Sequence, residues 1–260
     1  RQRLPNSKRS AECNTISRRV RNFLSITQVY HDSICYNLVM YDKIKNKSAY
    51  LFDMDGTLVD TEPIGPLVFE THFADYGKQL SSDEKELFAK VWRRDGTDIK
   101  EDVYIEQLRQ KYAINEEPAT FLQLFFDKYK RAIVSANPLP GVDRFLKQAH
   151  TDGIKLAIVT SSKREQATAI LDFHGWTELF DLIVSEEDIT KFKPDPEPFL
   201  IAVQKLGLSS EDCVVFEDAK NGVVAAKAAN IYVIGLRAGN EVEQDLSSAN
   251  LIVQSFAETS

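Results

Sequence analysis

Residues 49–60 read Ala-Tyr-Leu-Phe-Asp-Met-Asp-Gly-Thr-Leu-Val-Asp, and this stretch decides the fold. It opens with a short apolar run, which is typical of a strand buried on both faces of a sheet. Asp53 and Asp55 follow directly, so both carboxylates can face one cleft once the chain turns. Gly56 permits that turn, and the Thr57 hydroxyl can hold the loop in place. The stretch predicts a buried strand that ends in a loop with paired carboxylates.

A calcium-binding loop is the main alternative for a sequence of the form Asp-x-Asp-Gly. An EF-hand loop that begins at Asp53 needs a glutamate at its twelfth position, but that position is Ile64. The apolar strand before the motif also favours a catalytic loop over a solvated turn. We therefore interpret Asp53 and Asp55 as candidate catalytic residues.

Short apolar runs and helical patterns alternate along much of the remaining chain. The runs recur at residues 156–159, 182–184, 214–216 and 232–234. The helical patterns lie between them, at residues 142–150, 164–173, 198–206 and 222–229. This alternation is typical of βαβ units, which build a parallel sheet with helices on both faces. We predict an α/β protein with a Rossmann-like parallel sheet, in which ligands bind at the carboxyl ends of the strands.

Residues 66–136 interrupt the alternation with one helical pattern after another. Apolar pairs recur there at helical spacing: Phe69/Phe73, Leu87/Val91 and Tyr104/Leu108. The aromatic stretch at residues 121–129 could line a cofactor or substrate site, but we interpret it as helix core. We predict an α-helical domain inserted into the sheet domain. The predicted boundaries are residues 63–137 for the helical domain and residues 48–62 with 138–260 for the core.

The net charge of −7 combines two unlike parts of the chain. Residues 1–49 hold ten Lys or Arg against three Asp or Glu, a net charge of +7, which leaves −14 for residues 50–260. The basic part has the composition of an organelle transit peptide, and a disordered basic tail has the same composition. We expect residues 1–47 to be a disordered or targeting extension. The protein is then cytoplasmic, or imported into an organelle if residues 1–39 are a transit peptide.

Composition excludes several classes of protein. Three cysteines without a CxxC pair argue against a disulfide framework and against a zinc site. No apolar run reaches the ~18 residues that a membrane span needs. The acidic body of the chain argues against a nucleic-acid binder, which would be basic. We therefore expect no membrane or nucleic-acid partner, and a monomer or weak dimer.

Three more motifs follow the aspartate loop in order along the chain. They are Val-Thr-Ser-Ser at residues 159–162, Lys-Pro-Asp-Pro at residues 193–196 and Glu-Asp at residues 217–218. With residues 53–60, they resemble the four signatures of the haloacid dehalogenase superfamily of phosphotransferases. The resemblance covers about residues 48–255. The helical insert is similar in place and size to the cap of the β-phosphoglucomutase-like subfamily, whose closure would exclude water from the site.

The resemblance implies a role for each motif. Asp53 would attack a phosphoryl group to form an aspartyl-phosphate, and Asp55 would act as general acid and then as general base. Thr160 would donate its hydroxyl to a phosphoryl oxygen, and Lys193 would add a positive charge beside the transferring group. Backbone amides around Ser161 would supply further donors to the substrate. Ser162 and Lys163 are interpreted as the start of a helix rather than as site residues.

The resemblance also implies Mg²⁺ as the cofactor. Asp53 and Asp218 would bind the ion, the backbone carbonyl of Asp55 would face it, and Glu217 would support its water shell. Cap residues would contact the substrate, and Trp92 and Arg94 are the candidates.

One position separates the reactions within the subfamily. β-Phosphoglucomutases place a histidine ten residues after the acid/base aspartate, and that position here is Gly65. The difference favours a Mg²⁺-dependent phosphohydrolase that cleaves a small phosphate monoester, such as a sugar phosphate or a similar metabolite. A phosphosugar mutase is one alternative, and a non-catalytic binding module is another. A dehalogenase is disfavoured, because haloacid dehalogenases lack the second aspartate, here Asp55.

Overall fold

A computed structural model of the chain describes residues 43–93, 97–237 and 244–259. The basic extension that the sequence predicts at residues 1–47 lies almost wholly outside these ranges, and so does the candidate transit peptide at residues 1–39. Among the described residues, no helix is both long and apolar enough to cross a membrane.

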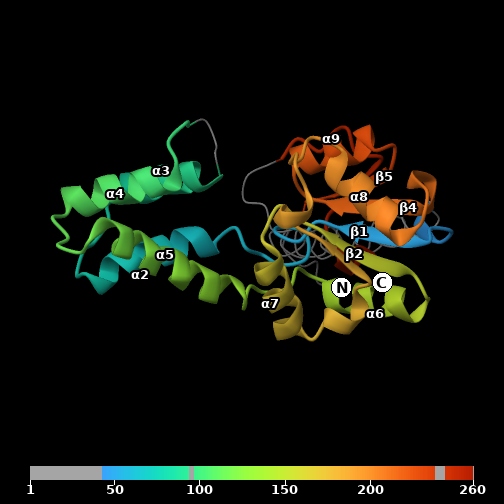
Figure 1. Ribbon diagram of the computed structural model, residues 1–260, viewed down its shortest axis with the longest axis horizontal. Helices are drawn as coiled ribbons and strands as arrows, with labels where there is room; N and C mark the ends of the chain where they lie inside the picture. The colour runs from blue at the N-terminus through green and yellow to red at the C-terminus, as the bar shows by residue number, and fades with distance from the viewer. Residues whose placement is uncertain (1–42, 94–96, 238–243, 260) are drawn as a thin grey trace, which may run out of the picture.

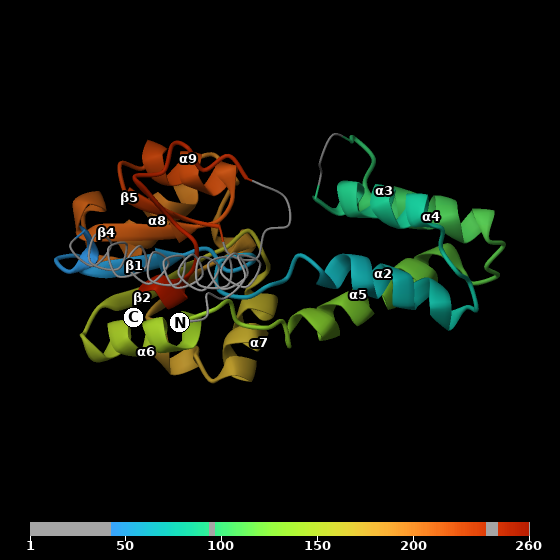
Figure 2. The same ribbon diagram turned by 180° about the vertical axis from the view of Figure 1, so that it is seen from behind.

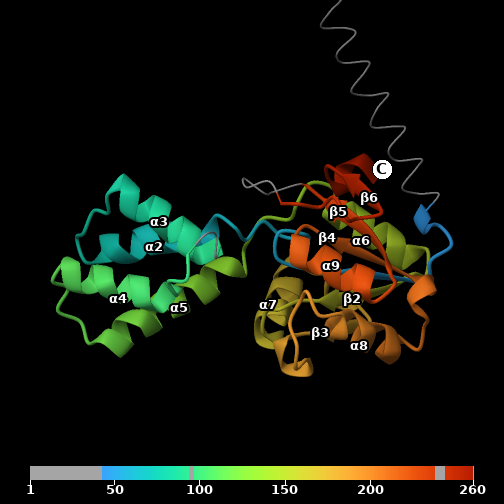
Figure 3. The same ribbon diagram turned by 90° about the horizontal axis from the view of Figure 1, so that it is seen from above.

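Six strands of the described chain form one parallel sheet in the order β3-β2-β1-β4-β5-β6 (Figures 1 and 3). They are β1 (Ala49–Phe52), β2 (Lys155–Val159), β3 (Leu182–Val184), β4 (Cys213–Glu217), β5 (Tyr232–Leu236) and β6 (Leu251–Val253). The order reverses between β1 and β4, the two strands that carry the first and last motifs. In open parallel sheets, ligands bind at the carboxyl ends of the strands beside such a reversal.

Helices cover both faces of the sheet (Figures 1 and 2). They are α6 (Val142–Thr151) and α7 (Arg164–His174) on one face, and α8 (Glu197–Leu206) and α9 (Lys220–Ala228) on the other. In β1, Tyr50 and Phe52 pack with the first pair, whereas Ala49 and Leu51 pack with the second. Successive side chains of a strand point to opposite faces. A strand covered on both faces must therefore be apolar throughout, as β1 is.

The four helices between β1 and α6 form a separate bundle to one side of the sheet domain (Figure 3). They are α2 (Ile64–Asp75), α3 (Ser82–Arg93), α4 (Glu101–Lys111) and α5 (Pro118–Ile133). Their aromatic side chains fill the bundle, and the rings of Phe69 and Phe88 stack with centroids 3.7 Å apart. Of the pair Leu87/Val91 that recurs at helical spacing, Val91 is buried; Leu87 is exposed, and its neighbour Phe88 is buried instead. Both residues are apolar, so the helical spacing alone could not fix which one faces inward.

The predicted fold class is confirmed, and five strands lie where apolar runs predicted them. The sixth strand, β6, was not predicted, because no helical pattern precedes its short apolar run. Short 3₁₀ turns complete the chain at Thr177–Leu179, Glu186–Asp188, Ser210–Asp212 and Phe256–Thr259.

Candidate active site

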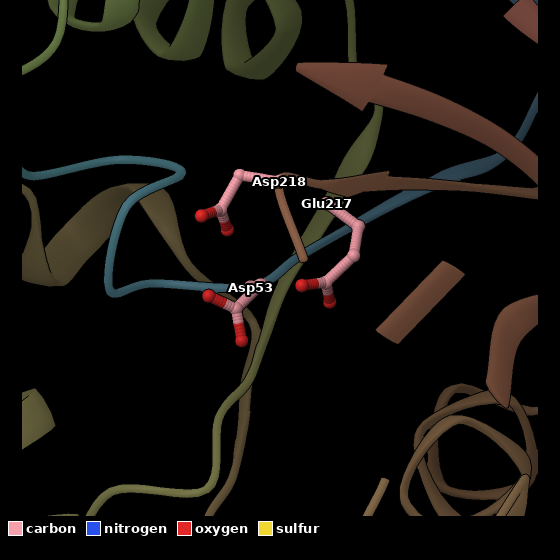
Figure 4. Close-up of side chains that lie close together, drawn as sticks. All are labelled: Asp53, Glu217 and Asp218. Atoms are coloured by element: carbon pink, nitrogen blue, oxygen red, sulfur yellow. The ribbon is translucent and has the colours of Figure 1, made fainter. Parts of the chain in front are cut away.

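Three carboxylates meet at the carboxyl ends of β1 and β4 (Figure 4). Asp53 follows β1, Glu217 is the last residue of β4, and Asp218 comes next. The two strands are adjacent and parallel, with Phe52 paired to Phe216, so the residues that follow them emerge at the same edge. One oxygen from each carboxylate lies within 4.8 Å of the other two. Oxygen donors in this number and spacing suit a hard divalent cation.

The aspartate loop makes room for Asp218 and also holds it. Gly56 has a φ of +81°, and a Cβ at this position would lie 2.3 Å from Oδ2 of Asp218. The buried hydroxyl of Thr57 donates a hydrogen bond to Oδ1 of Asp218 at 2.8 Å. The two residues that the sequence assigned to the turn therefore also position an acidic side chain from β4. Gly222 plays a similar part on the other side, since a Cβ there would lie 2.0 Å from the Glu217 carboxylate.

We expect Gly56→Ala to weaken Mg²⁺ binding by about 10- to 100-fold, because the new methyl group would push Asp218 out of the cluster. Calorimetric titration with Mg²⁺ measures this change. Gly153→Ala is the matched control, since Gly153 has a φ of +76° and nothing lies within 4 Å of its Cβ position. That control places an alanine at a positive φ as well, so it carries the same conformational strain, but its methyl group does not contact a metal ligand. Equal losses of Mg²⁺ affinity in both variants would contradict the steric explanation.

Lys193 lies buried between two of the carboxylates. Its Nζ contacts Oδ1 of Asp53 at 2.6 Å and Oε2 of Glu217 at 2.8 Å, and its side chain is 7% exposed. Burial by itself would lower the pKa of Lys193, but the charges of Asp53 and Glu217 outweigh it and raise that pKa. Burial and the charge of Asp53 raise the pKa of Glu217. Lys193 is thus a fixed positive charge beside Asp53.

Asp55 stands in a different environment, although it lies only two residues from Asp53. Its Oδ2 accepts a hydrogen bond from the Ser162 hydroxyl at 2.7 Å and a longer one from the Thr160 hydroxyl at 3.5 Å. Burial raises the pKa of Asp55, the charge of Asp53 raises it further, and the Ser162 hydroxyl only partly opposes them. Two neighbouring carboxyl groups therefore differ, one paired with an ammonium group and one favoured in its protonated form.

Ser162 contacts the site although the sequence interpretation placed it only at a helix start. The helix α7 begins at Arg164, and the Ser162 backbone amide also donates to the Thr160 hydroxyl at 3.0 Å. The sequence signal was the run of hydroxyl residues at the end of β2, which does not reveal which hydroxyl turns toward Asp55. Ser161, the candidate substrate contact, is exposed.

A cavity of about 290 Å³ lies between the sheet edge and the helical bundle. Asp55, Ser162 and Asp218 line it from the sheet domain, and Trp92 and Tyr129 line it from the bundle. The structure therefore brings the candidate substrate contact Trp92 to the site. Arg94, the other candidate in the helical insert, lies outside the described residues. Tyr129 was missed, because its spacing in the aromatic stretch is the same as that of a helix-core residue.

The parallel sheet and the carboxylates at the carboxyl ends of its strands define an α/β enzyme, with an acidic site next to a helical insert. Residues 50–236 match the family described as haloacid dehalogenase-like hydrolase. The chain belongs to this family.

Relatives and solved structures agree with that membership. The chain is 33% identical to the phosphorylated carbohydrates phosphatase of Thermotoga maritima, over 70% of this chain and 82% of the relative. It is 28% identical to the bifunctional riboflavin kinase/FMN phosphatase of Arabidopsis thaliana, over 82% of this chain but only 54% of that longer protein. A crystal structure of a putative β-phosphoglucomutase from Thermotoga maritima matches with a TM-score of 0.71 and 29% identity, over 82% of this chain and 96% of that one.

Proposed function

We propose that this protein is a Mg²⁺-dependent phosphatase that cleaves a small phosphate monoester through an aspartyl-phosphate. The observation that carries the proposal is the pair of unlike environments at Asp53 and Asp55. A nucleophilic carboxylate must be ionised, and a general acid must hold a proton. Lys193 pairs with Asp53, and burial raises the pKa of Asp55, so each carboxyl group is suited to one of these tasks.

The reaction then has two steps on this chain's own residues. In the first, a carboxylate oxygen of Asp53 forms a bond to phosphorus while the bond to the leaving oxygen breaks, and Asp55 gives that oxygen its proton. In the second, Asp55 takes a proton from water as the water attacks phosphorus. The bond between Asp53 and phosphorus breaks, and inorganic phosphate is released. Lys193 and the Thr160 hydroxyl would stabilise negative charge on the phosphoryl oxygens in both steps.

The cluster of Asp53, Glu217 and Asp218 fits a Mg²⁺ ion. Asp53, Asp218 and the backbone carbonyl of Asp55 would hold the ion, and Glu217 would support its water shell. The hydrogen bond from Thr57 fixes the orientation of the Asp218 carboxylate, as expected for a ligand that must meet a preferred geometry. When bound, the ion would offset the repulsion between an anionic nucleophile and an anionic phosphate.

A sugar phosphate or a similar metabolite is the proposed substrate class. One relative is named a phosphatase of phosphorylated carbohydrates, and it covers most of this chain. Trp92 borders the cavity above Asp55, where the leaving group would lie. Arg94 stays a candidate contact for a second anionic group.

Two alternatives fit the site less well. A mutase of the β-phosphoglucomutase type would carry a histidine in place of Gly65. Trp92 occupies the space beside Gly65, since a Cβ there would lie 2.2 Å from the indole. A non-catalytic binding module would not need a buried lysine between Asp53 and Glu217. It would also not need hydroxyl groups that donate hydrogen bonds to Asp55.

A panel of phosphate monoesters, assayed for free phosphate with Mg²⁺ and with a chelator, tests the proposal. Release of phosphate from a sugar phosphate that depends on Mg²⁺ is the expected result. A mutase would instead give an isomerised phosphate ester and would need a bisphosphate activator. Absence of turnover across the whole panel would overturn the phosphatase proposal.

A further inference from the structure

Two aromatic side chains from different helices of the bundle form one wall of the cavity. Trp92 lies near the end of α3, and Tyr129 lies in the last turns of α5. Their rings meet edge to face, with centroids 4.8 Å apart and planes inclined by 70°. Both residues border the same cavity as Asp55, the candidate general acid. The wall therefore stands on the side where a leaving group would depart.

The position of the indole is fixed by its neighbours. Gly65, in the first turn of α2, has no side chain, and a Cβ there would lie 2.2 Å from Cε2 of Trp92. On other sides the indole packs against Phe88 at 5.6 Å and Phe125 at 6.2 Å between ring centroids. Tyr129 packs against the apolar clusters of both the bundle and the sheet domain. Rings held in this way form a preformed surface, which lowers the entropy cost of binding.

The polar ends of the two rings have no protein partner within the described ranges. Neither the Tyr129 hydroxyl nor Trp92 Nε1 makes a hydrogen bond to another described residue. Both side chains are half-buried, and the polar ends of tyrosine and tryptophan rings packed in this way usually do find a partner. Since both residues border the cavity, a bound ligand can supply the missing acceptor. Glu62 and Gln244 also line the cavity, and their oxygens can accept hydrogen bonds from hydroxyl groups.

We propose that Tyr129 determines specificity for a polyhydroxy leaving group, by donating a hydrogen bond from its phenol to a leaving-group hydroxyl while the aromatic wall contacts the apolar face. This inference rests on the proposed phosphatase function. It also selects among leaving groups, because the carboxylates of Glu62 and Asp218 border the same cavity and repel a leaving group that carries its own carboxylate.

Tyr129→Phe tests the inference with three substrates, namely a sugar phosphate, phosphoglycolate and acetyl phosphate. We expect kcat/KM for the sugar phosphate to fall by about 5- to 10-fold, mainly through KM, because one hydrogen bond to the leaving group is lost. Turnover of acetyl phosphate, which has no hydroxyl group, should change by less than about 2-fold. Inhibition by inorganic phosphate should be unchanged, since phosphate lacks the leaving group whose hydroxyl Tyr129 would contact.

Two more variants complete the test, one expected to reproduce the effect and one expected to have none. Gly65→Ala should reproduce the selective loss on the sugar phosphate, because its methyl group would displace the Trp92 indole while the residues at positions 92 and 129 stay unchanged. Tyr76→Phe is the matched control, since Tyr76 is a half-buried tyrosine of the same bundle that packs on Phe121 away from the cavity. It should leave all three substrates unaffected.

The outcomes separate this inference from the proposed function. A parent protein that prefers phosphoglycolate, or a Tyr129→Phe variant that loses activity equally on all three substrates, would overturn the specificity role and leave the phosphatase intact. A variant identical to the parent on every substrate would overturn it as well. If the parent hydrolyses none of the three substrates, the phosphatase proposal fails first.

Discussion

Replacing Asp53 by asparagine is expected to lower kcat by at least about 10³-fold, because an amide cannot form the aspartyl-phosphate. The change keeps the size of the side chain, and its remaining carbonyl oxygen can still accept a hydrogen bond from Lys193. Lys193 also keeps Glu217, which it contacts at 2.8 Å. The buried ammonium group is therefore not left without an anionic partner. The loss should fall on the chemical step rather than on folding.

Stability measurements distinguish these two effects. Asp53, Glu217 and Asp218 place carboxylate oxygens within 4.8 Å of one another, and like charges at this distance repel. Removal of one negative charge offsets the loss of the ion pair with Lys193. We therefore expect the free energy of unfolding without Mg²⁺ to change by no more than about 1 kcal/mol. Added Mg²⁺ should stabilise the variant less than it stabilises the parent, because one ligand is missing.

Phosphate release and urea unfolding are the two measurements for Asp53→Asn. Asp152→Asn serves as the control, since Asp152 is an exposed aspartate at the end of α6 that makes no contact with the acidic cluster. It should retain full activity and full Mg²⁺ stabilisation. Activity of Asp53→Asn within 10-fold of the parent would mean that another group is the nucleophile.

The sequence predicts the aspartate loop well because its determinants are local. The strand, Asp53, Asp55 and the turn at Gly56 lie within a few residues of each other, so their spacing already limits the geometry. The link between the first and last motifs also follows from the sequence, once a parallel sheet is predicted. Two strands that run in the same direction end at the same edge, and their terminal acids then meet.

Contacts that depend on the exact path of a turn could not be predicted. Ser161 and Ser162 are chemically identical neighbours, and only the chain path after β2 turns the second toward Asp55. The same limit applies in the helical bundle. Helical spacing identifies an apolar face, but it does not distinguish a ring that faces other helices from one that faces a cavity. Phe125 and Tyr129 are one helical turn apart in α5, and only Tyr129 borders the cavity.

The contact between Lys193 and Glu217 also depends on the exact path of the chain. Its removal is the second change from which we expect a large loss, here a loss of stability and of activity. Lys193→Met keeps most of the apolar stem but removes the charge between two carboxylates. The Glu217 side chain is 2% exposed, so water cannot replace the lost partner. Breaking a buried ion pair in this way costs about 3–5 kcal/mol. We expect that loss in the free energy of unfolding without Mg²⁺ at pH 9, above the Glu217 pKa of about 8, together with loss of activity.

The cost of Lys193→Met should depend on pH in a defined direction. Burial and the charge of Asp53 raise the pKa of Glu217 above its ordinary value of 4.5, and Lys193 opposes this rise. Without Lys193, that pKa rises further. A carboxyl group with a raised pKa in the folded state destabilises the fold only where it must ionise, and its protonated form is tolerated at lower pH. The stability deficit of the variant should therefore shrink as the pH falls through about 8, the pKa of Glu217 in the parent, and change little below that pH.

Urea unfolding of parent and variant at several pH values measures this trend. Adding Glu217→Gln to Lys193→Met should recover part of the stability at pH 9 and no activity, because the amide needs no counter-charge but the lysine is still missing. Lys191→Met is the matched control, since the Lys191 side chain is 67% exposed and only pairs with Asp195 at 3.4 Å. It should leave stability nearly unchanged at every pH. A deficit that is constant across pH would show that Lys193 acts through packing rather than through its charge.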